Sequence, residues 1–184
     1  KEIYPQAEIE EVRASMGGMG SYYGLMRADE SLLSKNPDLV FIEFAINDSY
    51  LSYTKDDSTR YMESLVRKCY ESNPNMDIVL VYTTDRNKKG DSTIWIQGFN
   101  TVADHYRLIT IDAGAFMKEK IGQNNWITYF SDSAHPNDKG HDLIFQIVSK
   151  TIESELKAVG TVNSLQKHTI PSAMGKNLLL KRKL

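Results

Sequence analysis

The chain has 184 residues and a mass of 20.9 kDa, enough for one domain with a full-sized hydrophobic core. Its 22 basic and 24 acidic residues nearly cancel, leaving a net charge of −2, so neither a nucleic-acid-binding surface nor a charged disordered tail is indicated. Cys69 is the single cysteine, which excludes an internal disulfide and argues against a cysteine-based metal site. No apolar run approaches the roughly 20 residues of a membrane span.

The N-terminal stretch KEIYPQAEIEEVRAS lacks the apolar core of a signal peptide, so the sequence does not indicate a localisation. Because the first residue is Lys1 rather than methionine, we expect that a preceding part was removed or is not included in this sequence.

Four stretches are predicted as strands. The clearest, residues 38–45 (DLVFIEFA), is rich in β-branched and aromatic residues, which is typical of a strand buried in a parallel sheet. The others cover residues 8–14, 77–82 and 108–112.

Helical patterns separate these strands, and the predicted helices cover residues 24–34, 58–72, 91–105, 113–121 and 138–159. The last one has its apolar residues on one stripe, with Asp138 as the expected N-cap and Gly160 at the expected C-cap. Strands that alternate with amphipathic helices predict an α/β fold, in which helices cover a parallel sheet. Since the pattern weakens after Gly160, we expect residues 1–160 to form the domain and residues 161–184 a C-terminal extension or the start of a further segment.

Three stretches fall where open α/β sheets place their ligand sites, at the carboxyl ends of strands. Residues 14–21 (ASMGGMGS) contain glycines that free the backbone to turn sharply and to point N–H groups at a ligand. In residues 43–48 (EFAIND), Asn47 follows the main strand and offers an amide donor. Residues 131–141 (SDSAHPNDKGH) place Asp132 three residues before His135, which suits a catalytic base with its orienting carboxylate.

Each stretch also has an ordinary structural explanation. A glycine-rich turn is often only a turn, an Asn-Asp pair commonly forms a turn or helix cap, and an Asp-x-x-His pair is commonly a surface pair. A phosphate-binding role for ASMGGMGS is disfavoured, because it lacks the lysine and the spacing of a P-loop. His141 is interpreted as a helix-face residue, and His105 and His168, which have no motif around them, as structural.

Taken together and in this order, the three stretches resemble the sequence blocks of the SGNH (GDSL-type) hydrolases, a family of serine esterases and acylhydrolases. ASMGGMGS is similar to the glycine block of that family, which maps its oxyanion glycine onto Gly18. EFAIND resembles the Gly-x-Asn-Asp block, with Ala45 in place of the glycine, and maps the oxyanion asparagine onto Asn47. DSAHP matches the Asp-x-x-His-Pro block and gives Asp132 and His135.

The resemblance covers about residues 8–156 and implies a flavodoxin-like three-layer α/β/α sandwich with acyl-transfer chemistry. His135 would take the proton of a serine hydroxyl and pass it to the leaving group, while Asp132 would hold the imidazole in the correct tautomer. The Gly18 N–H and the Asn47 amide would bond the developing oxyanion. This chemistry calls for no cofactor and no metal.

The nucleophile of the family lies in a Gly-Asp-Ser or Gly-Gly-Ser block after the first strand, and no such block precedes Gly18 here. We therefore expect the first strand and the serine to lie upstream of Lys1. Without that strand, which lies inside the family's sheet, two strand edges would be unpaired and oligomers could form through them. Four serines flank the recognised stretches and are better explained as loop or capping residues: Ser15, Ser21, Ser131 and Ser133.

The expected substrate is a small-molecule or glycan ester, with no nucleic-acid or membrane partner. The forms of the glycine and asparagine blocks look more like the carbohydrate-directed branch of the family, which favours removal of O-acetyl groups from a sugar. Four aromatic residues are candidates for a sugar-stacking surface near the His loop, the stretch that carries Asp132 and His135, although aromatic residues at such positions more often belong to a core: Trp95, Trp126, Tyr129 and Phe130.

The alternative hypothesis is that the chain is a non-catalytic relic. It would then bind an acylated ligand, or pair its open sheet edge with a partner that supplies the missing strand. The segment before Lys1 discriminates between the two hypotheses, because a serine block there would support the enzyme.

Overall fold

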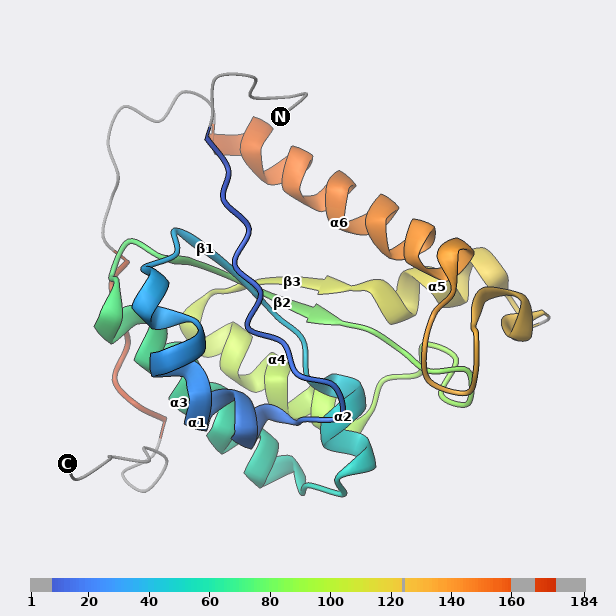
Figure 1. The fold of residues 1–184 in the computed structure, drawn as a ribbon, viewed down its shortest axis with the longest axis horizontal. Helices are drawn as coiled ribbons and strands as arrows, with labels where there is room; N and C mark the ends of the chain where they lie inside the picture. The colour runs from blue at the N-terminus through green and yellow to red at the C-terminus, as the bar shows by residue number, and fades with distance from the viewer. Residues whose placement is uncertain (1–7, 124, 160–167, 175–184) are drawn as a thin grey trace.

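The computed structural model describes residues 8–123, 125–159 and 168–174, and its centre is a parallel sheet with helices on both faces (Figure 1). The strands are β1 (Leu39–Ile42), β2 (Asp77–Tyr82) and β3 (Ile109–Asp112), and they lie in the order β1-β2-β3. Both pairs are parallel, with Phe41 opposite Val79 and Val79 opposite Ile109. The predicted α/β fold with a parallel sheet is therefore confirmed.

The helices form one layer on each side of the sheet (Figure 1). On one face, α3 (Lys55–Ser72) connects β1 with β2 and α4 (Ile94–Tyr106) connects β2 with β3, while α1 (Ser21–Ser31) packs against α3. Because each strand is connected to the next by a helical crossover, the three strands run in the same direction and their carboxyl ends meet at one edge.

The opposite face is covered by α5 (Ala113–Ile121) and α6 (Asp138–Val159). Three short helices complete the described chain: η1 (Leu33–Lys35) before β1, α2 (Ala45–Tyr50) after it, and η2 (Trp126–Tyr129) before the His loop. No helix of the described residues is long and apolar enough to cross a membrane.

Alternating strand residues build the core on the two faces. Val40, Ile42, Ile78 and Leu80 are buried with side chains of α1, α3 and α4, whereas Val79, Val81 and Ile111 face Ile144, Ile147, Val148 and Ile152 of α6. On β1 the residues of the α6 side, Leu39 and Phe41, remain 44% and 48% exposed. Within the described chain, β1 pairs only with β2, so its other edge carries no strand.

The predicted bounds of three elements, 77–82, 113–121 and 138–159, agree with β2, α5 and α6. The predicted strand over residues 8–14 is wrong, since this segment forms no strand and Ile9 is 65% exposed. A strand requires a hydrogen-bonding neighbour. The side-chain contact found here is a local one between Arg13 and Glu11.

The predicted N-cap of α6 is also corrected. Asn137 caps the helix, because its side-chain oxygen accepts hydrogen bonds from the backbone N–H groups of Lys139 at 3.0 Å and Gly140 at 3.3 Å. Asp138 is the first helical residue, where its charge suits the helix dipole. Gly160, the predicted C-cap, lies outside the described residues.

Residues 168–174 lie against the face that α3 and α4 form. The backbone N–H of His168 donates to the Pro74 carbonyl at 3.0 Å, and the N–H of Met174 donates to the buried Glu63 carboxylate at 2.7 Å. Ile170 and Met174 pack against the core of this face. This part of the predicted extension therefore contributes apolar contacts to the domain.

The central strand generates a stability prediction. Replacing Leu80 by Ala leaves a cavity at a position that is 0% exposed, so the free energy of unfolding should fall by about 2–5 kcal/mol. Denaturant unfolding followed by circular dichroism measures this loss. The control is Ile127→Ala, at a position that is 68% exposed, for which a change of less than about 0.5 kcal/mol is expected. Equal losses in the two variants would contradict the assignment of Leu80 to the core.

Candidate active site

The glycine turn precedes α1 at the carboxyl edge of the sheet. Gly17 and Gly18 are exposed at its tip, and Gly18 has φ of +73°, a left-handed conformation that favours glycine. The N–H of Met19 donates to the Met16 carbonyl at 3.4 Å and closes the turn. Gly18, the predicted oxyanion glycine, thus lies on a sharp, solvent-facing turn.

A buried carboxylate joins this turn to α2. Asp48 is 0% exposed and accepts three hydrogen bonds: from the Ser21 N–H at 2.7 Å, the Ser21 hydroxyl at 2.7 Å and the Ser58 hydroxyl at 2.8 Å. Burial raises the pKa of Asp48, and the hydrogen bonds from both serines oppose that rise. Gly20 makes this approach possible, because a Cβ there would lie 2.5 Å from the Asp48 carboxylate.

Asn47 comes from α2 and reaches back to the glycine turn. Its side-chain Nδ2 donates to the Met19 carbonyl at 3.0 Å, across 28 positions of sequence. The predicted strand over residues 38–45 is shorter in the structure, since β1 ends at Ile42. Asn47 lies in a helix that begins at Ala45, whose N–H donates to the Glu43 carboxylate at 3.0 Å. The two predicted oxyanion elements, Gly18 and Asn47, are therefore brought together.

Asp132 and His135 form a directly bonded pair in the loop before α6. The Asp132 Oδ2 lies 2.8 Å from Nδ1 of His135, and its Oδ1 accepts the backbone N–H groups of Ala134 at 2.7 Å and His135 at 2.8 Å. The side chain of His135 is 80% exposed, and Nε2 has no hydrogen-bond partner among the described residues. A carboxylate on Nδ1 places the hydrogen of a neutral imidazole there, which leaves Nε2 as the basic nitrogen.

The hydrogen bonds that Asp132 accepts determine its charge. The backbone N–H groups of His135 and Ala134, together with the His135 ring, lower the pKa of Asp132 to about 2. Asp132 is therefore a carboxylate throughout the pH range in which esterases work, as a group that orients and stabilises a protonated histidine must be.

Backbone contacts hold the His loop in a fixed shape. Phe130 and Pro136 form an isolated antiparallel bridge, and the Ser131 N–H donates to the His135 carbonyl at 2.8 Å. The Arg86 N–H, from the loop after β2, donates to the Ser133 carbonyl at 3.0 Å. The Asp132–His135 pair is thus supported both by its own loop and by the loop after β2.

None of the four candidate serines is hydrogen-bonded to the His135 imidazole. Ser21 is 0% exposed and donates its hydroxyl to Asp48, so it serves as a structural residue. Burial raises the pKa of the Cys69 thiol to about 12, which argues against a cysteine nucleophile.

The predicted sugar-stacking surface is wrong for two of its four aromatics. Trp126 and Phe130 are 3% and 4% exposed and pack with Met117 in a small core under α6. Trp95 and Tyr129 are half-buried, and the indole N–H of Trp95 donates to the Tyr53 carbonyl at 2.6 Å. The pattern did not distinguish these because an aromatic near a loop fits a core as well as a surface.

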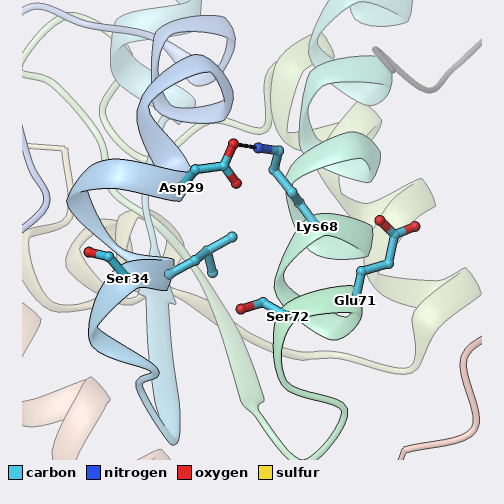
Figure 2. A pocket seen from close by; sticks show the side chains of 6 residues that line it. Asp29, Ser34, Lys68, Glu71 and Ser72 are labelled. Carbon is cyan, nitrogen blue, oxygen red and sulfur yellow. Dashed lines mark hydrogen bonds and ion pairs between the residues drawn. The ribbon is translucent and has the colours of Figure 1, made fainter. Parts of the chain in front are cut away.

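A shallow hollow elsewhere on the molecule is lined by none of the predicted site residues (Figure 2). It lies between α1 and the end of α3, where Lys68 and Asp29 form an ion pair beside Leu33 and Glu71. Because these helices end just before β1 and β2 begin, the hollow is at the amino edge of the sheet, opposite the candidate active site.

The sequence matches the profile of the GDSL-like Lipase/Acylhydrolase family over residues 3–143. This match covers most of the chain, and the chain belongs to that family. A comparison with curated protein sequences gave no match.

Solved structures share the fold. A two-domain esterase active on acetylated mannans is 28% identical, with a TM-score of 0.78 over 96% of this chain, and this chain spans 46% of its length. An acetyl xylan esterase variant from Geobacillus stearothermophilus is 20% identical, with a TM-score of 0.69 over 89% of this chain and 79% of its own. A GDSL-like lipase from Parabacteroides merdae, described as putative, is 15% identical, with a TM-score of 0.65 over 74% of this chain and 69% of its own.

The depressed pKa of Asp132 generates a prediction on stability. Because its folded pKa lies below its unfolded value, the carboxylate contributes stability above about pH 4, and this contribution is lost as the pH falls toward about 2. Wild type should therefore exceed Asp132→Asn in unfolding free energy at pH 5, and the difference should shrink as the pH approaches 2. Denaturant titrations of both proteins at a series of pH values measure it. A difference that does not change with pH would contradict the role of the charge.

Proposed function

We propose that this chain supplies the base, its orienting carboxylate and the oxyanion donors of a serine ester hydrolase that removes O-acetyl groups from a carbohydrate. The single observation that carries the proposal is the Asp132–His135 pair. Its Nε2 is exposed and has no hydrogen-bond partner among the described residues, so it can accept a proton from a hydroxyl. The glycine turn and Asn47 at the carboxyl edge of the sheet support it with donors for an oxyanion.

In the proposed reaction, Nε2 of His135 takes the proton of a serine hydroxyl as the serine oxygen attacks the acetyl carbonyl carbon. The negative charge that develops on the carbonyl oxygen is bonded by the N–H of Gly18 and by the second Asn47 amide hydrogen, since the first is held by Met19. Asp132 stabilises the protonated imidazole, which then gives its proton to the sugar oxygen as the ester C–O bond breaks, so that the sugar leaves as an alcohol and the acetyl group stays on the serine. Water, activated by the same histidine, attacks the acetyl-serine and releases acetate.

The serine itself is proposed to lie outside these 184 residues, in the family's serine block expected upstream of Lys1. The exposed, unpaired Nε2 and the buried state of Ser21 support this assignment. Among the described residues one edge of β1 has no partner strand, which is consistent with an additional strand beside it, as in the expected fold of the family.

The carbohydrate substrate is supported by the relatives. The 28% identical protein is active on acetylated mannans, so an O-acetylated polysaccharide or oligosaccharide is the proposed substrate class. The 20% identical acetyl xylan esterase supports the assignment of the fold alone.

The roles of the site residues are tested by substitution in the intact protein. His135→Ala should abolish ester hydrolysis, and Asn47→Ala should lower turnover by about 10²–10³-fold without unfolding the protein, because it removes one oxyanion donor. Hydrolysis of an acetylated model ester, with circular dichroism as a fold check, measures both. His141→Ala is the matched control, an exposed histidine of α6 outside the site, and should keep its activity. Full activity of His135→Ala would contradict the proposal.

The source of the nucleophile is tested by mass spectrometry with a fluorophosphonate, which tags activated serines. One adduct on the intact protein, and none on an isolated 184-residue chain, is the expected result. An adduct on the 184-residue chain would place the nucleophile within it and overturn the assignment of an outside serine. No adduct on either protein would favour a non-catalytic binding role.

A further inference from the structure

The orientation of Asn47 depends on how α2 is held, since this helix has only six residues, Ala45–Tyr50. A helix so short has little stability of its own. Asp48, the residue directly after Asn47, is held by its hydrogen bonds with Ser21 and Ser58. Its last residue, Tyr50, lies three positions after Asn47, and its hydroxyl donates to the Asp85 carboxylate at 3.3 Å.

Asp85 is an anchor of fixed position and charge. It is 0% exposed and accepts the backbone N–H groups of Asn87 at 2.8 Å and Lys88 at 2.7 Å, while the Lys88 ammonium lies 2.5 Å away. Burial alone would raise the pKa of Asp85, but its hydrogen bonds with Lys88 and Asn87 outweigh that effect, and the pKa is lowered. The Lys88 ammonium also lies 4.8 Å from the centre of the Tyr50 ring, so one cation holds both the carboxylate and the ring.

The loop after β2, which contains Asp85, also contacts the loop that carries Asp132 and His135. Arg86, next to Asp85, donates its N–H to the Ser133 carbonyl at 3.0 Å, within the loop that carries Asp132 and His135. Tyr50 itself lies near this loop: partial burial and the negative charges of Asp85 and Asp132 raise the pKa of Tyr50. Contacts therefore run from α2 through Tyr50 and Asp85 to the His loop.

We propose that Tyr50 is a positioning residue, which couples the oxyanion donor Asn47 to the His135 loop through its hydrogen bond to Asp85. This inference rests on the proposed function, since the two groups it aligns are those of the ester hydrolase. Tyr50 is 53% exposed, so the hydroxyl is not required to complete the core. Its role is to hold α2 at a fixed distance from the loop after β2.

The test uses Tyr50→Phe in the intact protein, which keeps the ring and removes only the hydroxyl. Loss of alignment between donor and base acts on the transition state, so kcat should fall roughly 10- to 100-fold with KM little changed. Tyr61→Phe is the matched control, because it removes a hydroxyl from a half-buried tyrosine of α3 outside the site, and its kcat should equal that of wild type. Thermal unfolding of both variants shows whether the fold is kept.

A double-mutant cycle separates positioning from a general structural effect. If Tyr50 acts through Asn47, Tyr50→Phe should lower kcat by less than about threefold once Asn47 is already Ala, because the group it aligns is gone. Losses that multiply independently would overturn the inference. So would an unchanged kcat in Tyr50→Phe, or a rise in KM alone, which would make Tyr50 a direct substrate contact. Inactivity of the wild type would instead refute the proposed function, before the Tyr50 comparison is made.

Discussion

The parallel pairing of β2 with a strand on each side is the constraint on which the rest of the structure depends. Because β1, β2 and β3 run in one direction, the segment after each strand leaves from the same edge of the sheet. Asn47 follows β1, and Asp85 and Arg86 follow β2, so the pairing alone brings these residues to one side. The crossover helices α3 and α4 stabilise this arrangement by burying one face of the sheet.

Two buried carboxylates then fix how these neighbouring segments are oriented relative to one another. Asp48 bonds α2 to Ser21 at the start of α1 and to Ser58 in the first turn of α3, and Asp85 bonds the end of α2 to the loop after β2. An unpaired buried carboxylate would be costly, so each strongly favours the single arrangement in which its donors are present. Networks of this kind favour a rigid site over a mobile one.

The two halves of the candidate site differ in how they are made. The Asp132–His135 pair is local, formed within four residues and fixed by hydrogen bonds to the loop's own backbone. The proposed oxyanion side joins Asn47 to Met19 across 28 positions and needs the folded domain. Acyl transfer requires both a base with a preorganised carboxylate and donors for an oxyanion, which are the roles proposed for these two halves.

The sequence alone was sufficient for the α/β class, for the bounds of β2, α5 and α6, and for the Asp-x-x-His pair, because hydrophobic periodicity and short spacings are local properties. It was misleading for residues 8–14, which were predicted as a strand, since a strand also needs a partner along its edge. It left open whether Trp126 and Phe130 belong to the core or to a surface, and it did not reveal the buried contacts of Asp48 and Asp85. Those facts depend on contacts between distant segments, and only the packing of the folded chain decides which side chains are buried and which donors reach a carboxylate.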